Sequence, residues 1–393
     1  MSVQRDCAFL YDERELTYRF HDDHPFNQQR IRLTVDLLQE AGALHPNEYV
    51  GSASATREEL LLNHTAEYIE VVEMLSIDPG NPALSDTADR YGLGEGDTPC
   101  FEGMHEATSL VVGATLKAAE LVMSGQVRHA LHLGGGLHHA FPNRGGGFCV
   151  YNDAAVAIAA IRRRYGARVL YVDTDVHHGD GVQFSFFGDP NVCTLSIHET
   201  GKFLFPGTGF AHERGDGAAF GTAVNIPLEP YTEDDSWMAC FETSINRVIQ
   251  SFKPDVIVSQ HGCDAHAYDP LAHMNCSMNI YREMPRLIHR LAHEYCEGRW
   301  IALGGGGYDI WRVVPRAWGL LWLEMSGHPL ASRIDSDAGL ALPPTWIRKW
   351  QPLSAEPLPP CWLDRPGDIE VMPRRAAIEE ANRRSLEIAL QYL

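Results

Sequence analysis

Residues 169–181 read VLYVDTDVHHGDG and carry the strongest structural signal in this chain of 393 residues. The apolar run at 169–172 predicts a short buried strand. Asp173, Asp175 and His177 then occupy every second position, so on an extended backbone their side chains point to the same side. The glycines that follow let the chain turn. The pattern predicts a strand that ends in carboxylates and imidazoles, which suit a divalent metal ion with mixed oxygen and nitrogen ligands.

Three further segments share this design, in which an apolar run opens into glycine and then presents a histidine, an aspartate or a tyrosine. They are LHLGGGLHHA at 131–140, VIVSQHGCD at 256–264 and WIALGGGGY at 300–308. Helix-like segments lie between them, at 152–165, 234–252 and 281–297. This alternation predicts an α/β fold, a single large domain with a central, mostly parallel sheet flanked by helices. Ligands of such sheets bind beyond the carboxyl ends of the strands, where we expect the active site.

The polar residues at these strand ends form a chemically coherent set. Asp175, His177 and Asp264 are three candidate metal ligands, which leaves one position open for water. A metal ion in such a site polarises a carbonyl oxygen and acidifies the water bound to it. The adjacent His138 and His139 are candidates for moving protons between that water and the leaving group.

Two carboxylates and a tyrosine complete the set. Asp173 and Asp180 are expected to orient the histidines and to raise their basicity. Tyr308 follows four glycines and is placed to donate a hydrogen bond to a developing oxyanion. Together these residues predict metal-assisted hydrolysis of an amide or an ester.

The same segments resemble the zinc-dependent histone deacetylase family. The matching stretches are 134–140, 147–153, 173–181, 205–209, 262–264 and 304–308. With HPFN at 24–27 and RIR at 30–32, they are most similar to the bacterial acetoin-utilization branch of that family. The resemblance runs from about residue 11 to about residue 327. It implies the arginase–deacetylase type of α/β fold and a zinc-dependent amidohydrolase that removes acetyl groups from the ε-amine of acetyl-lysine in proteins.

The resemblance also implies a role for each residue of the set. The implied zinc ligands are Asp175, His177 and Asp264. Because two carboxylates make this ligand set hard, Fe²⁺ is the alternative ion. The implied proton relay consists of His138 with Asp173 and His139 with Asp180, and Tyr308 would polarise the acetyl carbonyl.

Further residues are implied to bind the substrate or structural ions. Phe148 and Phe205 would wall a narrow channel for the apolar stem of acetyl-lysine. Gly147, next to Phe148, is also implied to contact the substrate. Leu271 and Asp97 would lie at the rim of the channel, and Arg30 would lie near an internal cavity for the acetate product. Structural K⁺ or Na⁺ ions would lie near Asp173 and Ser196, and near Phe186 and Val192.

Three alternatives to a protein deacetylase stay open at this point. The enzyme could act on small acetylated amines such as polyamines, could be an arginase-like hydrolase with two manganese ions, or could be a silent binding module. His178 and Gly179, however, stand where a manganese motif would place its second carboxylate. A fourth ligand from His261 or His266 would close the metal site and end catalysis.

Composition narrows the class of protein. The net charge of −20 argues against direct binding to nucleic acid. No apolar run reaches the roughly 20 residues that a membrane span needs, and residues 1–6 lack the apolar stretch of a signal peptide. The nine cysteines, without a Cys-x-x-Cys pair, fit a reducing compartment. We therefore expect a cytoplasmic enzyme.

The expected organisation is a catalytic domain at 1–330 and a tail at 331–393. The tail begins with a proline-rich segment at 340–360, which predicts an irregular strap, and continues as a helix-like run at 374–392. This helix is expected to pack on the main domain or at a subunit interface, so an oligomer is compatible with the sequence. The expected partner is an acetylated protein, with acetyl-CoA synthetase as one candidate, or a small acetylated amine.

Overall fold

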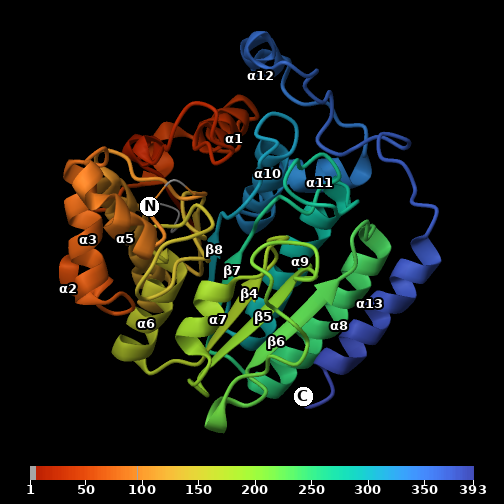
Figure 1. Ribbon diagram of the computed structural model, residues 1–393. Helices are drawn as coiled ribbons and strands as arrows, with labels where there is room; N and C mark the ends of the chain where they lie inside the picture. Colours follow the sequence, from red (N-terminus) through yellow and green to blue (C-terminus); the bar gives the residue numbers. More distant parts are fainter. Residues whose placement is uncertain (1–5, 95) are drawn as a thin grey trace.

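Eight parallel strands form the centre of the molecule (Figure 1). The computed structural model describes residues 6–94 and 96–393. The strand order is β2-β1-β3-β8-β7-β4-β5-β6, and each strand is parallel to its neighbours. The strands are β1 Cys7–Leu10, β2 Tyr49–Val50, β3 His129–His132, β4 Val169–Asp173, β5 Val192–Glu199, β6 Ala223–Leu228, β7 Val256–Gln260 and β8 Trp300–Leu303. The predicted sheet is confirmed, and it is entirely parallel.

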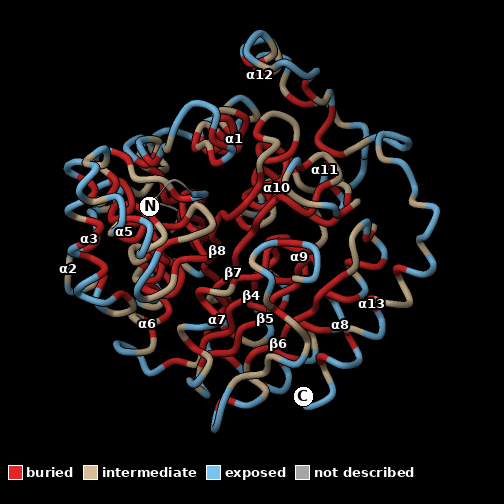
Figure 2. The backbone as a smooth tube through the Cα atoms, viewed as in Figure 1, coloured by how far each residue is buried: buried red, intermediate tan, exposed pale blue. Residues whose placement is uncertain are grey.

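Helices cover both faces of the sheet, as parallel sheets require. One face packs against α5 (Met104–Met123), α6 (Asp153–Tyr165) and α7 (Asp180–Phe186). The other face packs against α1 (Gln29–Glu40), α8 (Asp234–Phe252), α9 (Met278–Tyr295) and α10 (Val314–Met325). Strand residues are accordingly buried on both sides, as Figure 2 shows in red for β4, β5, β7 and β8.

The alternating side-chain directions along β4 explain why helices cover both faces of the sheet. Leu170 and Val172 contribute to the core beneath α8 and α9, whereas Val169 and Tyr171 contribute to the core beneath α5 and α6. Successive strand side chains point to opposite faces, so a strand that is apolar at every position must be covered twice.

Local signals set the helix boundaries. Asn152 caps α6 by accepting a hydrogen bond from the backbone N–H of Ala155, and Gly166 ends the helix in a left-handed conformation. The helix α8 has the predicted bounds, while α9 begins three residues earlier than predicted, because Ser277 caps it through the N–H of Asn279.

A smaller layer of helices and turns lies against α5 and α6. A third apolar core, centred on Tyr18, Tyr68 and Tyr151, holds this layer against α5. Its helices are α2 Arg57–Leu60, α3 Ala66–Ile77 and α4 Ser85–Arg90.

The C-terminal segment lies on the surface of the main body (Figure 1). Its helices are α11 Pro329–Ser336, α12 Pro344–Trp350 and α13 Arg375–Ala389. The predicted division at residue 330 falls inside α11. Helix α13 packs against β6 and α8, where the buried Asn382 accepts a hydrogen bond from the N–H of Glu229 at 2.8 Å.

The prediction of an irregular strap at 340–360 was wrong in part, because α12 lies within it. Proline is compatible with the first turn of a helix, so Pro344 does not prevent it. The side chains of Trp346 and Trp350 fix α12 on α1, since their indole N–H groups donate to Leu33 O at 3.1 Å and to Asp36 Oδ2 at 2.6 Å.

Two further observations bear on the predicted class of protein. Among the described residues, no helix has both the length and the apolar character needed to cross a membrane. No two cysteines of the described residues are joined by a disulfide. Residues 1–5, on which most of the signal-peptide expectation depends, lie outside the described residues.

Candidate active site

Asp175, His177 and Asp264 meet at the carboxyl edge of the sheet. Asp175 and His177 follow β4, and Asp264 follows the neighbouring strand β7. The Nδ1 atom of His177 lies 3.1 Å from Asp175 Oδ1 and 3.1 Å from Asp264 Oδ2. All three residues are buried, and their candidate ligand atoms lie within 4.8 Å of one another.

The remaining oxygen of each carboxylate is held by neighbouring groups. Asp175 Oδ2 accepts hydrogen bonds from the Gly306 N–H and from Gln260 Nε2, both at 2.7 Å. Asp264 Oδ1 accepts from the Val176 N–H at 2.9 Å. A Cβ atom at Gly306 would lie 2.1 Å from Asp264 Oδ2, so only glycine allows this close approach. The carboxylates are therefore oriented before any ion binds.

The charges of this group fit a bound cation. Burial and the charge of Asp175 raise the pKa of Asp264 to about 6. Burial would lower the pKa of His177, but the two carboxylates raise it to about 10. A proton on His177 therefore offsets the negative charge that a divalent ion would neutralise. Two carboxylate oxygens and one imidazole nitrogen are donors that suit Zn²⁺ or Fe²⁺.

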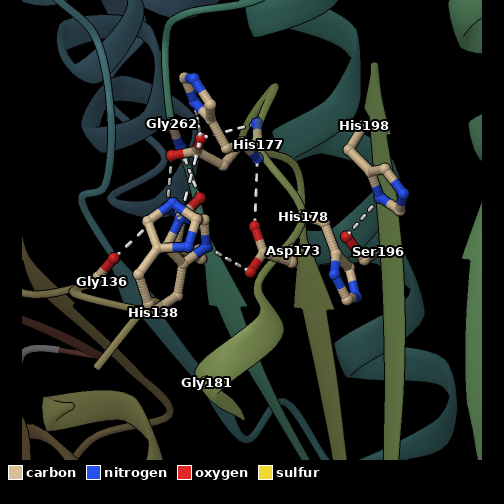
Figure 3. A network of polar contacts seen from close by, with 12 residues as sticks. Gly136, His138, Asp173, His177, His178, Gly181, Ser196, His198 and Gly262 are labelled. Atoms are coloured by element: carbon tan, nitrogen blue, oxygen red, sulfur yellow. Dashed lines mark hydrogen bonds and ion pairs between the residues drawn. The ribbon is translucent and has the colours of Figure 1, made fainter. Parts of the chain in front are cut away.

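His138 and His139 form two histidine–carboxylate pairs next to this group. Figure 3 shows the pair of His138 with Asp173. His138 Nδ1 donates to Asp173 Oδ2 at 2.8 Å, and His139 Nδ1 donates to Asp180 Oδ1 at 2.7 Å. The two Nε2 atoms lie 3.0 Å apart. Each carboxylate thereby fixes the tautomer of its histidine and leaves Nε2 facing the site.

The two histidines have different proton affinities. Burial would lower the pKa of His138, but Asp173 and Asp175 raise it to about 9. Burial and the neighbouring charge of His138 lower the pKa of His139. His139 is therefore the histidine of the pair that stays neutral and can accept a proton.

A narrow pocket of about 260 Å³ leads to these residues. It is lined by Asp97, His139, Gly147, Phe148, His177, Leu204, Phe205, Leu271 and Tyr308. The Phe148 ring meets Tyr308 edge-on at 5.6 Å, and the Phe205 ring meets His139 edge-on at 5.0 Å. Aromatic walls around a polar end suit a substrate with an apolar stem and a polar tip.

Backbone hydrogen bonds hold the Phe148 wall in an unusual conformation. Phe148 has a φ of 68°, a left-handed value that costs free energy for a non-glycine residue. Its N–H donates to Thr98 Oγ1 at 2.9 Å, and its carbonyl accepts from the Tyr18 hydroxyl at 2.6 Å. At the preceding Gly147, a Cβ atom would lie 2.3 Å from the ring of His139, so glycine is required there.

Tyr308 reaches the pocket from the glycine loop after β8. Its N–H donates to Asp269 Oδ2 at 2.8 Å, which fixes the backbone at this position. Burial and the charges of Asp264 and Asp175 raise the pKa of its phenol well above the usual value. The phenol therefore keeps its proton and is available as a hydrogen-bond donor.

Comparison with known proteins identifies the family. A family model described as "Histone deacetylase domain" matches residues 24–325. This chain belongs to the histone deacetylase family. The acetoin utilization protein AcuC of Bacillus subtilis (strain 168) is 53% identical over 387 residues, which are 98% of this chain and 97% of that protein. AcuC of Staphylococcus aureus (strain Mu50 / ATCC 700699) is 46% identical over 386 residues, again 98% and 97%. The predicted resemblance to the acetoin-utilization branch is confirmed.

Solved structures agree with this assignment. A crystal structure of an HDAC homologue complexed with SAHA has a TM-score of 0.84 and 28% identity, and covers 98% of this chain and 100% of that chain. An HDAC homologue from Aquifex aeolicus has a TM-score of 0.82 and 28% identity, and covers 96% and 100%. The arginase–deacetylase fold is thus confirmed. The protein is a deacetylase of this family, and the buried Asp–His–Asp group indicates that it depends on a metal ion.

Arg30 of the deacetylase does not line the pocket formed by the described residues. It lies on α1, where its guanidinium donates to the carbonyl of Gly307 at 3.0 Å and contacts the rings of Phe26 and Trp318 at 4.7 and 5.1 Å. Burial lowers its pKa. Arg30 therefore braces the backbone next to Tyr308, and its role near an acetate cavity stays a prediction.

Of the residues predicted to surround monovalent cations, Asp173 and Ser196 lie at the carboxyl edge beside the site, whereas Val192 lies at the amino edge of the sheet. Asp173 and Ser196 are partners on β4 and β5, and Ser196 Oγ lies 2.8 Å from His198 Nδ1 (Figure 3). Phe186 ends α7 and Val192 begins β5. The turn between them closes through Asp189, whose N–H donates to Phe186 O at 3.0 Å and whose carbonyl accepts from Val192 N at 3.2 Å. Cation binding at both places stays a prediction.

Two residues that support the site, Gln260 and Asp269, are absent from the predicted set. Gln260 contacts Asp175 and also accepts the N–H of Gly262 at 2.8 Å. Asp269 holds the backbone of Tyr308. Gln260 is the last residue of β7, so its place at a strand end could have indicated it, whereas nothing in the local sequence connects Asp269 with Tyr308.

The extra histidines around Asp264 have other partners. His261 Nε2 lies 2.7 Å from Ser259 Oγ, and burial lowers the pKa of this histidine to about 3. His266 Nε2 lies 3.0 Å from Asp364 Oδ2. Within the described residues, neither histidine belongs to the group formed with Asp175.

Proposed function

We propose that this deacetylase removes the acetyl group from the ε-amine of acetyl-lysine in proteins. The observation that carries the proposal is the narrow pocket of about 260 Å³, walled by Phe148 and Phe205, that ends at the Asp–His–Asp group. The apolar stem of acetyl-lysine fits between aromatic walls, and its amide would reach the polar end. At the exposed rim, the carboxylate of Asp97 can accept a hydrogen bond from a peptide N–H of the substrate.

Asp175, His177 and Asp264 would hold the metal ion, Zn²⁺ or Fe²⁺. When bound, the ion would polarise the acetyl carbonyl and lower the pKa of a water molecule. The same three residues suit a single ion. A second, arginase-like ion would need a further carboxylate near His178, but this histidine lies 2.8 Å from Thr208 Oγ1 and 3.1 Å from Gln183 Oε1.

The residues of the chain would divide the proton transfers and the charge stabilisation. His139, whose Nδ1–H is committed to Asp180, would accept the proton of the attacking water at Nε2, which lies 3.0 Å from His138 Nε2. His138, paired with Asp173, would hold a proton for the departing amine. The phenol of Tyr308 would donate a hydrogen bond to the oxyanion that forms from the acetyl group.

The substrate class is tested by comparing kcat/KM for an acetyl-lysine peptide and for acetylspermidine. We expect the peptide to be the better substrate, and acetylated acetyl-CoA synthetase is the first intact protein to test, because the relatives are named for acetoin utilization. Preference for acetylspermidine would overturn the proposal in favour of a deacetylase of small amines.

The rim supplies a second, independent test. Asp97→Asn keeps an oxygen that can accept from the N–H of Gly147, now 3.1 Å from Asp97 Oδ2, but removes the charge. A hydrogen bond to a charged group contributes about 1.5–3 kcal/mol, so KM for the peptide should rise roughly 10-fold or more. KM for N-butylacetamide, an uncharged acetylated amine without a peptide backbone, should stay the same. An equal rise in KM for both substrates would contradict a role of Asp97 in binding the peptide backbone.

A further inference from the structure

Three histidines converge at the amino edge of the sheet, away from the pocket. His129 is the first residue of β3, and His289 and His293 are one turn apart on α9. His289 Nε2 lies 3.2 Å from His129 Nε2 and 3.2 Å from His293 Nε2. The catalytic candidates His138 and His139 follow the opposite, carboxyl end of β3, so the two clusters lie at opposite edges of the sheet.

The spacing of these nitrogens matches the spacing of ligands around a small ion. Zinc–nitrogen bonds of about 2.0–2.1 Å in a tetrahedral site place neighbouring ligand nitrogens about 3.3 Å apart. The three ligand atoms of His129, His289 and His293 all lie within 4.8 Å of one another. A ligand set made only of imidazoles suits Zn²⁺ and other late transition ions and does not suit Mg²⁺ or Ca²⁺.

A carboxylate fixes the central histidine in the form that binds a metal. His289 Nδ1 donates to Glu324 Oε1 at 2.9 Å, and Arg286 lies 3.5 Å from the other oxygen of Glu324. Because an ionised carboxylate only accepts hydrogen bonds, the proton of a neutral His289 lies on Nδ1 and its Nε2 carries a lone pair. This is the arrangement of a carboxylate–histidine–metal site.

The surroundings of the cluster keep the other imidazoles neutral and ordered. Burial and the neighbouring histidines lower the pKa of His129 to about 3, and burial lowers that of His293. The ring of Trp300 lies 5.9 Å from His129 and 5.6 Å from His289. The indole N–H of Trp300 donates to Ser259 Oγ at 2.7 Å, so this wall is fixed.

The cluster also has an approach from solvent. Exposure increases from His129, which is buried, through His289 to His293, which is exposed. All three histidines border a cavity of about 510 Å³. An ion could therefore enter past His293 and keep a water molecule as its fourth ligand.

We propose that His129, His289 and His293 form a second metal site, which binds one Zn²⁺ ion per chain and ties the start of β3 to α9. A site of this kind stabilises the folded chain, because the ligands come together only when the sheet and α9 have packed. The competing arrangement is a hydrogen-bonded row of histidines that holds no ion.

The test is the zinc content of the full-length protein after saturation with Zn²⁺ and dialysis, measured by elemental analysis. We expect about two zinc ions per chain in the wild type, one from each cluster, and about one in His293→Ala and in His289→Gln. His293 is exposed, so its removal leaves the fold intact. The matched control is His212→Ala, which removes an exposed histidine outside the cluster and should keep about two ions.

Thermal unfolding and catalysis supply the further readouts. Added Zn²⁺ should raise the Tm of wild type and His212→Ala by more than that of His293→Ala, with deacetylase turnover the same in all three proteins within about twofold. Equal zinc contents in wild type, His293→Ala and His289→Gln would overturn the proposal. Loss of one ion in His212→Ala as well would also overturn it, because the second ion would then be adventitious.

Discussion

The two clusters of candidate metal ligands lie at opposite edges of the sheet and differ in charge. Strands β3 and β8 carry His129 and Trp300 at their amino ends, and lead to His138 and Tyr308 beyond their carboxyl ends. The carboxyl-edge cluster consists of two buried carboxylates and one imidazole, whereas the amino-edge cluster consists of three imidazoles of graded exposure.

This difference shows which cluster requires a cation. Two buried carboxylates are costly unless a positive charge neutralises them, and their charges raise the pKa of His177 to about 10. Three neutral imidazoles carry no such charge, so the amino-edge cluster can persist with or without an ion. We therefore expect the carboxyl-edge cluster to determine activity and the amino-edge cluster to affect stability alone.

The largest expected effect is the loss of the carboxyl-edge ion. Asp175→Ala or Asp264→Ala should abolish both the bound ion and deacetylation, because each removes a ligand and leaves the remaining charges unbalanced. Metal content is best measured in the His293→Ala background, where the amino-edge cluster does not contribute. Asp235→Ala, a change at a side chain that is 82% exposed, is the control. Two manganese ions per chain would contradict a single-ion centre.

The second largest expected effect is the loss of the residue that accepts the proton, His139. His139→Ala should lower kcat by about 10²–10⁴-fold, the usual contribution of general acid–base catalysis, with the metal content unchanged. His138→Ala should also be severe. Because one group must be neutral and another protonated, the plot of kcat/KM against pH should be bell-shaped. Near-normal turnover in His139→Ala would assign the proton transfer to another group.

Tyr308→Phe should lower kcat by a smaller factor, through loss of a hydrogen-bond donor to the oxyanion. Removing an oxyanion donor typically lowers kcat by about 10²–10³-fold, or about 2.7–4 kcal/mol. Because the bond strengthens as negative charge develops, KM should change little. Both constants are measured with an acetyl-lysine peptide. A turnover within about threefold of wild type would mean that Tyr308 serves only to pack the glycine loop.

The smallest expected effect is the coupling between the clusters. Tyr308→Phe and His293→Ala affect residues at opposite edges of the sheet without common contacts, so their effects on kcat/KM should add within about 0.5 kcal/mol. The double variant, compared with both single variants, measures this directly. A larger coupling free energy would show that the amino-edge cluster influences catalysis through β3 or β8.

The sequence by itself determined the elements and the local chemistry of the carboxyl edge. The two-residue period of strands predicts Asp173, Asp175 and His177 on one side. In the structure β4 ends at Asp173, and the turn after it positions the other two, since the Asp175 N–H donates to Asp173 Oδ1 and the His177 N–H donates to Asp175 Oδ1. Alternating strands and helices require a parallel sheet, whose carboxyl ends share an edge. The prediction that His138, Asp264 and Tyr308 come to the same edge as Asp175 follows from these two rules.

Only the tertiary structure decided which of these residues touch and what supports them. The strand order places β7 beside β4, which brings Asp264 to His177. It also brings Gln260 to Asp175, and the loop after β7 brings Asp269 to Tyr308. The amino-edge cluster joins His129 to His289 across 160 positions of sequence. No local pattern encodes such contacts, because they depend on how distant segments pack against one another.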